Sequence, residues 1–231
     1  MKLSKRLQEI ADLVPKGSIV ADIGTDHGYV PAYLIQNNIS KLVIATDISE
    51  GSLEKTINYV KDKQLERKIL TRLGDGLEVI KPFEVDTVII AGMGGLLIGD
   101  ILEKNKNVTD SITYFILQPM VASKELRQYL IDNKFIIIDE GLVKEDNKFY
   151  EIIFAMKGLD YIENHIYYEI SQKLIDKNNP LLREFIQNKI NISENIMKEL
   201  KSKESSKSIE KYENLKRSVA IYREVLEKIE G

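Results

Sequence analysis

A short polar stretch carries the residue types with the clearest chemistry, Asp22-Ile-Gly-Thr-Asp-His-Gly28, and it follows an apolar, β-branched run. Gly24 permits a sharp turn, and Gly28 lets a helix begin close to the backbone. A strand, a glycine turn and a helix start form a nucleotide-sized pocket at the carboxyl end of a parallel sheet. Asp22 and Asp26 place two carboxylates there. The stretch therefore favours a cofactor with an amine or sulfonium charge, and S-adenosylmethionine is one.

The glycine spacing differs from the dinucleotide-binding fingerprint. Gly24 and Gly28 are four residues apart with Thr-Asp-His between them, which is not G-x-G-x-x-G. A pyrophosphate needs bare backbone amides, and Asp26 would repel it. A nicotinamide-dependent oxidoreductase is therefore the least favoured enzyme class. An ordinary glycine turn in an α/β domain is the alternative that requires no ligand.

Acidic residues end two further apolar runs. Asp47 lies 23 residues after Gly24, near the separation expected of an acid that accepts hydrogen bonds from ribose hydroxyls. A helix N-cap is the alternative for Asp47. Asp75-Gly76 follows the third apolar run, and Asp75 could accept a hydrogen bond from the amino group of an adenine. A plain Asp-Gly turn is the alternative.

A glycine-rich loop follows the most apolar strand pattern of the chain. Residues 85–91 run directly into Gly92-Met-Gly-Gly95. Glycines remove side chains where a backbone must approach another group closely, and Met93 offers a soft apolar surface. A loop that needs positive φ angles is the alternative reading.

Composition limits the class of protein. The chain has 231 residues, enough for one α/β domain and a smaller appendage. It has no cysteine, which excludes disulfides and thiolate chemistry, and only two histidines, so no metal site is expected. The net charge of −3 requires any nucleic-acid contact to come from a local patch. No signal peptide or membrane-spanning run is evident, so we expect a cytoplasmic location.

Alternating patterns predict the fold class. An amphipathic helix opens the chain, and Lys2, Lys5 and Arg6 lie on or beside its polar face. A face that only contacts solvent is the alternative to a functional role for these residues. The expected strands are 19–23, 42–48, 68–74, 85–91, 112–117, 135–138 and 150–156, the last two joined by a hairpin at 144–148. Helices are expected between the others at 30–37, 50–64, 96–104 and 123–133, the last capped by Ser123 with Lys124 and Arg127 exposed. This series predicts an α/β fold, a Rossmann-like seven-stranded doubly wound sheet.

With these motifs in place, residues 1–158 resemble class I S-adenosylmethionine-dependent methyltransferases, and more closely the bacterial tRNA (adenine-N1)-methyltransferases that act on adenine 22. The resemblance rests on Leu3-Ser-x-Arg6-Leu, Ala21-Asp-Ile-Gly-Thr-Asp-His-Gly28, Thr46-Asp-Ile48, Gly74-Asp-Gly-Leu77, Ala91-Gly-Met-Gly-Gly95 and Gln118-Pro119. The glycine loop lacks the Asn/Asp-Pro-Pro-aromatic motif of enzymes that methylate exocyclic amines, which argues against amino-group chemistry.

The resemblance implies a role for each residue of these motifs. The groups expected nearest the target base are Asp26, His27 and Gln118, although a structural role for His27 in the turn is equally possible. Cofactor contacts are expected from Asp22, Gly24, Gly28, Asp47, Ile48, Asp75, Gly76, Ala91 and Gly92. Substrate contacts are expected from Arg6, Met93, Gly94, Lys124 and Arg127. Ring N1 of adenine carries its own lone pair, so its methylation needs alignment in a dry pocket rather than a base.

The last third of the chain, 159–231, is expected to form a separate helical domain, and the family carries a coiled-coil appendage. Three-four spacing marks one coiled-coil seam, formed by Ile209, Tyr212, Leu215, Val219, Tyr222, Leu226 and Ile229. A helix over 181–201 is the expected antiparallel partner. Five lysines gather near the hairpin tip, namely Lys198, Lys201, Lys203, Lys207 and Lys211. They suit either a solvated hairpin or an arm that touches tRNA phosphates.

The leading hypothesis is therefore an S-adenosylmethionine-dependent tRNA methyltransferase acting on N1 of adenine 22. The expected partner is tRNA, with no membrane and no metal, and the chain is expected to be a monomer or weak dimer. Two other classes stay open: a small-molecule methyltransferase, and a non-catalytic cofactor-binding adaptor for RNA. The intact turn and glycine loop favour an enzyme over an adaptor.

Overall fold

The structure, a computed structural model, describes residues 2–201 and 205–230. The chain divides into two compact units, Met1–Tyr161 and Ile162–Gly231. Lys203, one of the five lysines expected near the hairpin tip, lies outside the described residues. Within the described ranges, no helix combines the length and apolarity needed to cross a membrane.

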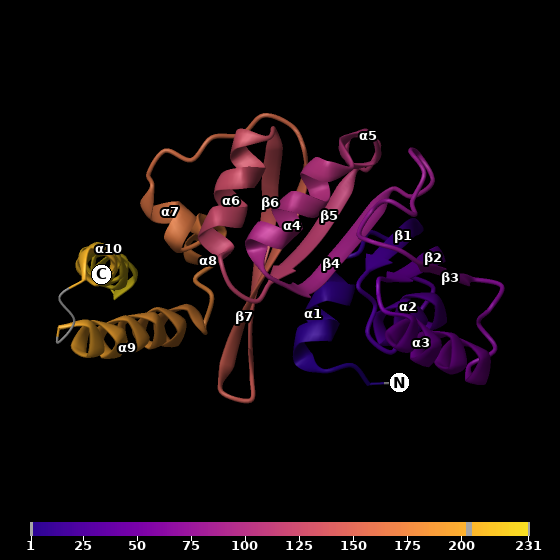
Figure 1. The fold of residues 1–231 in the computed structure, drawn as a ribbon, viewed down its shortest axis with the longest axis horizontal. Coiled ribbons are helices and arrows are strands. Elements are labelled where there is room, and N and C mark those ends of the chain that lie inside the picture. The colour runs from indigo at the N-terminus through magenta and orange to yellow at the C-terminus, as the bar shows by residue number, and fades with distance from the viewer. Residues whose placement is uncertain (1, 202–204, 231) are drawn as a thin grey trace. The chain divides into compact units, whose positions relative to one another are not determined.

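The first unit is a seven-stranded sheet between two layers of helices (Figure 1). Its strands are β1 (Ser18–Ile23), β2 (Ser40–Asp47), β3 (Ile69–Leu73), β4 (Thr87–Met93), β5 (Tyr114–Pro119), β6 (Phe135–Glu145) and β7 (Lys148–Lys157). Its helices are α1 (Lys5–Asp12), α2 (Tyr29–Gln36), α3 (Glu50–Asp62), α4 (Gly95–Lys104), α5 (Lys106–Thr109) and α6 (Ser123–Asp132). The strand order is β3-β2-β1-β4-β5-β7-β6.

The strand pairing confirms the predicted Rossmann-like sheet. Strands β1 to β5 pair in parallel, and only β7 runs antiparallel to both of its neighbours, β5 and β6. Strand order reverses between β1 and β4, whose carboxyl ends are adjacent because Ile23 pairs with Ile90. Such a switch point opens a crevice beyond the strand ends, where ligands bind in open α/β sheets.

Alternating side chains divide the core between the two faces of the sheet. Ile90 and Phe115 belong to one buried cluster, together with residues of α4 and α6. Ile89 and Ile116, one position away on the same strands, belong to the other cluster, together with residues of α1, α2 and α3. Strands that are buried on both faces consist of continuous apolar runs, which explains why these strands could be predicted from the sequence.

The structure corrects two local details. Strand β6 extends to Glu145, well past the predicted end at residue 138, and Asp146 and Asn147 make the hairpin turn with positive φ angles. Ser123 does not cap α6 as predicted. The N-cap is Ala122 in the left-handed conformation without a side-chain cap, so Ser123 is the first helical residue.

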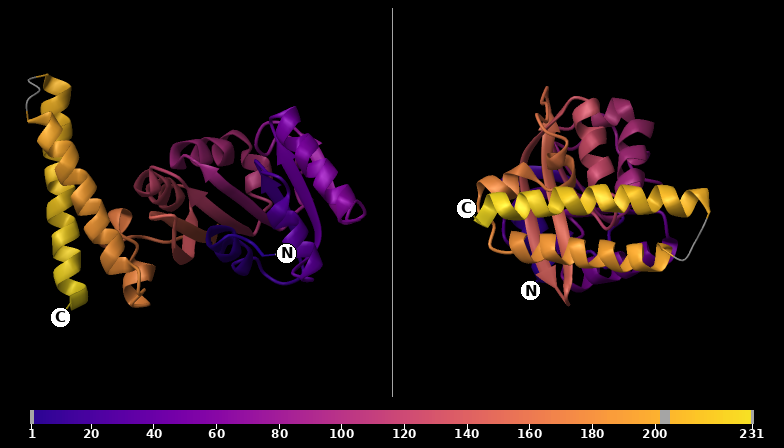
Figure 2. Two further views of the ribbon diagram at one scale, coloured as in Figure 1. Left: turned by 90° about the horizontal axis from the view of Figure 1, so that it is seen from below. Right: turned by 90° about the vertical axis from the view of Figure 1, so that its left-hand side faces the viewer.

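The second unit is a helical hairpin preceded by two short helices. Its elements are α7 (Ile166–Glu169), α8 (Gln172–Asp176), α9 (Leu182–Leu200) and α10 (Ser206–Glu230). Helices α9 and α10 lie antiparallel alongside each other (Figure 2). Val219 and Tyr222 are buried as the seam predicts, but Val225 is buried in addition and Ile209 is exposed. The paired helices are therefore present, while their supercoiling stays a prediction.

Candidate active site

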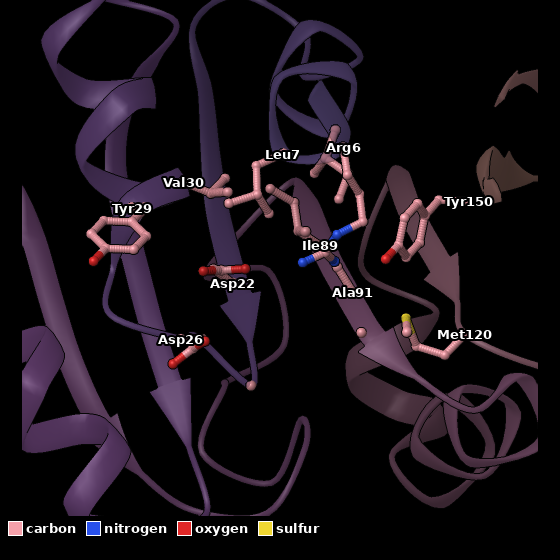
Figure 3. A pocket seen from close by; sticks show the side chains of 13 residues that line it. Arg6, Leu7, Asp22, Asp26, Tyr29, Val30, Ile89, Ala91, Met120 and Tyr150 are labelled. Carbon is pink, nitrogen blue, oxygen red and sulfur yellow. The ribbon is translucent and has the colours of Figure 1, made fainter. Parts of the chain in front are cut away.

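A cleft of about 450 Å³ lies at the switch point between β1 and β4 (Figure 3). Its polar lining comes from the strand ends, the following turns and α1, while apolar side chains of α1, α2 and β4 close its walls. The lining residues are Arg6, Leu7, Ile10, Asp22, Gly24, Asp26, Tyr29, Val30, Ile89, Ala91, Gly92, Met120 and Tyr150. The structure thus brings together predicted residues from three separate motifs, the opening helix, the turn after β1 and the glycine-rich segment at the end of β4.

Asp22 is the one buried carboxylate of this lining. It lies on β1 with Ile89 paired beside it on β4. Burial raises the pKa of Asp22 to about 6, and the nearby charge of Asp47 acts in the same direction. A buried carboxylate of this kind gains strongly from a cationic partner. The group therefore fits the amine or sulfonium charge that the sequence indicates.

Two glycines keep the cleft open on either side of Asp22. Gly24 has a φ of +74°, and a Cβ there would lie 2.4 Å from the terminal methyl of Met93. Gly92 has a φ of +80°, and a side chain there would extend toward Arg6. Both positions require the left-handed region, which other residues rarely adopt. The bare backbone at these turns fits a ligand held against the strand ends.

Arg6 forms a polar cluster over the β5 side of the cleft. Its guanidinium Nη1 donates to Gln118 Oε1 at 2.7 Å, and its Cζ lies 5.4 Å from the centroid of the Tyr150 ring. Its backbone N–H donates to a carboxylate oxygen of Glu145 at 3.0 Å. Gln118 is fully buried and also donates to the carbonyl of Pro119. In this structure Gln118 therefore orients Arg6 and has no surface of its own in the cleft.

Asp26 and His27 lie in the turn between β1 and α2. Asp26 lines the cleft, and its Oδ1 is 3.5 Å from His27 Nε2. The His27 backbone is left-handed, and its ring stacks on Tyr29 with centroids 5.3 Å apart. Tyr29 in turn meets Tyr59 edge-on. His27 thus supports the turn and Tyr29, whereas Asp26 and Tyr29 face the cleft.

The remaining predicted cofactor residues lie at the neighbouring strand ends. Asp47 ends β2 and accepts a bond from the backbone N–H of Ser49, and Ile48 beside it is exposed. The N-cap of α3 is Ser49, so the alternative role of Asp47 as that cap is wrong. Asp75 is exposed and pairs with Lys104 at 3.2 Å. Asp47, Ile48, Asp75 and Gly76 lie outside the lining of the cleft, so their contacts with the cofactor stay predictions.

Gly28, Met93 and Gly94 serve packing in the structure. A Cβ on Gly28, which has a φ of +69°, would lie 2.8 Å from a methyl of Thr56. Met93 packs against the core on the α4 side of the sheet. Gly94 is the N-cap of α4. Their predicted contacts with cofactor or substrate stay predictions.

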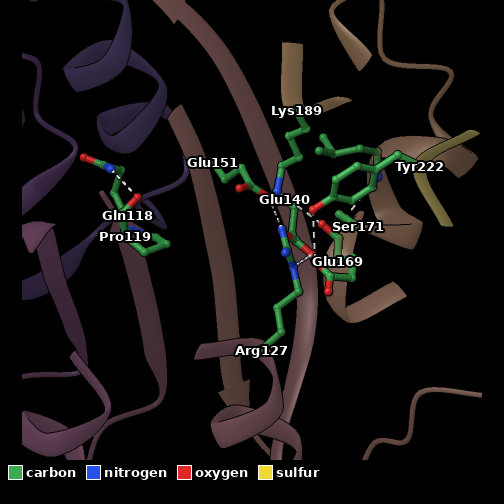
Figure 4. A network of polar contacts seen from close by, with 10 residues as sticks. Gln118, Pro119, Arg127, Glu140, Glu151, Glu169, Ser171, Lys189 and Tyr222 are labelled. Carbon is green, nitrogen blue, oxygen red and sulfur yellow. Dashed lines mark hydrogen bonds and ion pairs between the residues drawn. The ribbon is translucent and has the colours of Figure 1, made fainter. Parts of the chain in front are cut away.

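The structure corrects the prediction for Arg127. It was expected on the exposed face of α6, but its side chain is buried and bonds Glu140 and Glu151 (Figure 4). The guanidinium donates to Glu140 at 2.6 Å and to Glu151 at 2.5 Å. A buried cation needs such partners to offset its lost hydration, so Arg127 is a structural residue. Lys124, on the same helix, is exposed as expected.

Sequence reasoning missed several lining residues. Tyr150 comes from β7, Met120 follows β5, and Leu7 lies on α1, all distant in sequence from the β1 turn. Two of the missed residues had a local signal, because Tyr29 directly follows the turn that ends at Gly28 and Leu7 directly follows Arg6. A cluster of three or more potential metal ligands is absent from the ranges that the structure describes.

Three comparisons define the family. A methyltransferase domain model matches residues 3–153. The chain is 42% identical over 158 residues, 68% of its length, to the tRNA (adenine(22)-N1)-methyltransferase of Bacillus subtilis. The chain belongs to this methyltransferase family. The alignment spans 66% of the length of that relative.

Solved structures of the family extend the match to nearly the whole chain. The B. subtilis tRNA methyltransferase TrmK is 33% identical, with a TM-score of 0.86, and the match covers 97% of this chain and 99% of that one. A Streptococcus pneumoniae protein in complex with S-adenosyl-L-methionine is 30% identical, with a TM-score of 0.88 and coverage of 97% and 100%. The predicted family and fold are therefore confirmed.

Proposed function

We propose that this protein transfers a methyl group from S-adenosylmethionine to N1 of adenine 22 in tRNA. The observation that carries the proposal is the match over 97% of the chain to the B. subtilis tRNA methyltransferase TrmK. In this proposal residues 1–158 form the methyltransferase domain and 159–231 a helical arm that contacts tRNA. The protein would act in the cytoplasm, where tRNA is processed.

The cleft has the groups that the cofactor needs. S-adenosylmethionine, when bound, supplies an electrophilic methyl group on a sulfonium. The buried Asp22 carboxylate would offset the positive charge of the methionine part, and the bare turns at Gly24 and Gly92 would admit it. Asp47 would accept bonds from the ribose hydroxyls, and Asp75 would lie near the adenine.

The remaining polar and aromatic groups suit the target base. N1 of neutral adenine carries a lone pair, so the chain needs no general base. The positive charge passes to the base as the methyl group leaves sulfur, which favours carboxylate and aromatic neighbours over cationic ones. Asp26, Tyr29 and Tyr150 meet that requirement at the cleft. Arg6, fixed by Gln118, would then bind the base edge or its phosphate rather than N1.

The test is methyl transfer from labelled S-adenosylmethionine to two tRNA transcripts, one with adenine 22 and one with guanine in its place. We expect N1-methyladenosine in the first transcript and no label in the second. Label in both would place the target elsewhere in the RNA. Label in neither, with the cofactor still bound, would refute the proposal and favour a small-molecule methyltransferase or an RNA adaptor.

A further inference from the structure

Four aliphatic side chains are exposed together beside the cleft. Leu96 and Leu97, in the first turn of α4, are 64% and 50% exposed. Met120 and Val121, which follow β5, are 48% and 67% exposed. We call these four residues the apolar rim. Single exposed apolar side chains are ordinary, whereas a group of them at a functional cleft marks an interaction surface.

Backbone contacts hold the two halves of the rim together. The N–H of Gly95 donates to the carbonyl of Val121, and the N–H of Met120 donates to the carbonyl of Met93, both at 2.8 Å. A Cβ on Gly95 would lie 2.2 Å from the carbonyl oxygen of Ala122, so only glycine allows this approach. The rim is therefore a preformed platform on two joined turns, and its side chains need no rearrangement to act.

The rim is continuous with the proposed active site. Met120 belongs both to the rim and to the lining of the cleft, where it lies near Ala91 and Tyr150 (Figure 3). Gly92, near the end of β4 and four residues before Leu96, also lines the cleft. A target base that enters from this side must pass the rim. A base in folded RNA must first leave its stack, which costs a few kcal/mol.

We propose that the apolar rim is a wedge that occupies the gap left in the RNA stack when the target adenine swings into the cleft. The inference rests on the proposed function and deepens it. When a base is extruded, the bases on either side of it each lose a stacking partner and expose a flat, apolar face. Aliphatic side chains can cover such faces, as they do in kinked nucleic acids. The rim carries no charged, hydroxyl or amide side chain, so it would stabilise extrusion without reading sequence.

The test uses the double variant Leu96→Ser/Val121→Ser, which spares Met120 and the backbone bonds. The matched control is Leu159→Ser, at a leucine that is 81% exposed and lies outside the rim. Each protein is given two substrates: intact tRNA, and the same tRNA with abasic residues on both sides of adenine 22. In the modified tRNA the adenine has no neighbouring bases to stack on, so its extrusion costs no stacking energy. A wedge would therefore not change the rate on that substrate.

We expect the double variant to lose about 10- to 100-fold in single-turnover rate on intact tRNA, since a few kcal/mol of unstacking is no longer offset. On the abasic-flanked tRNA its rate should equal that of the unchanged protein. 2-Aminopurine at position 22 should brighten on binding to the unchanged protein and to the control, and stay dim with the double variant.

Two results would overturn the wedge while leaving the proposed function intact. One is an equal loss on both tRNAs, which would mean damage to the cleft. The other is full activity of the double variant, including the case in which sedimentation shows that the rim instead joins two copies of the chain. Failure of the unchanged protein to methylate either RNA would refute both proposals.

Discussion

At the scale of single residues, Asp22 combines a site role with a cost in stability. The pKa of Asp22 in the folded protein is raised from 3.8 to about 6, because burial penalises its charged form. A folded-state pKa above the unfolded value means that the folded protein binds the proton more tightly. The resulting loss of stability is fully present above pH 6 and vanishes below about pH 4. Such strain is expected where a ligand charge completes the site.

We therefore expect Asp22→Asn to stabilise the ligand-free protein at pH 8, by at most about 3 kcal/mol. The gain should shrink as the pH falls from 6 to 4. Urea unfolding at several pH values measures it, and cofactor titration of the same variant should show a weakened affinity. Asp26→Asn, at an exposed carboxylate, is the control and should change the stability by less than about 0.5 kcal/mol. A pH-independent difference for Asp22→Asn would contradict this account.

We propose that Gln118 acts through Arg6 rather than on a ligand, because its side chain is buried and bonds the Arg6 guanidinium. Its buried oxygen accepts the 2.7 Å bond from the Arg6 guanidinium, so its loss would release a cation that faces the cleft. This bond joins two motifs that are distant in the sequence, one on α1 and one at the end of β5.

We predict that Gln118→Leu raises the KM for tRNA about tenfold, in line with a lost charge-assisted hydrogen bond. The affinity for S-adenosylmethionine should not change. Arg6→Ala should have a similar effect, and the double variant little more than either single one, because the two residues act as a unit. Gln128→Leu, at an exposed glutamine of α6, is the matched control. Additive losses would show that Gln118 and Arg6 act separately.

At the scale of elements, a buried ion cluster joins α6 to the β6–β7 hairpin. Arg127 comes from the helix, Glu140 from β6 and Glu151 from β7. The spacing of apolar residues in α6 alone would place the Arg127 side chain in solvent. A cluster of this kind fixes the register of a helix on a sheet, and removal of one partner leaves buried charge uncompensated.

Arg127→Met should lower the free energy of unfolding by about 3–5 kcal/mol, because two buried carboxylates lose their common cation. Urea unfolding with an unchanged m-value measures this. The triple variant Arg127→Met/Glu140→Gln/Glu151→Gln should recover part of the loss, since it removes the buried charges as well. Gln128→Met, at an exposed glutamine of the same helix, should be nearly neutral. Equal stability of the two methionine variants would refute a role for the cluster.

At the scale of the whole molecule, the chain combines a methyltransferase sheet with a separate helical hairpin. The net charge of −3 gives no general attraction for RNA. Lys198 and Lys201, at the C-terminal end of α9, and Lys207, in the first turn of α10, are exposed. We propose that they form the local positive patch that a tRNA-binding arm requires.

Reversal of these three lysines to glutamate should weaken tRNA binding and reduce the slope of log K against log salt by about 2 to 3. Cofactor affinity should stay constant, because the cleft lies in the other unit. Reversal of three exposed lysines of the α3 region serves as the control, namely Lys55, Lys61 and Lys68. An unchanged slope for the tip variant would show that the hairpin does not contact phosphates.

The sequence by itself determined the sheet and the cofactor turn. Buried parallel strands are continuous apolar runs, and the glycines at 24 and 92 follow them directly, so both signals are local in the chain. The family motifs added the cofactor and substrate class, because Asp-Ile-Gly-Thr-Asp-His and Ala-Gly-Met-Gly-Gly are strings of consecutive residues.

Only the tertiary structure decided which side chains meet. Tyr150 reaches the cleft because β7 pairs with β5, and Met120 reaches it because β5 pairs with β4. No local pattern encodes either contact. Arg127 is buried because two carboxylates from other strands offset its charge, whereas helical periodicity predicts exposure for an arginine. Burial, partner identity and the pKa of Asp22 all depend on neighbours distant in sequence, so they follow from the fold and not from the spacing of residues.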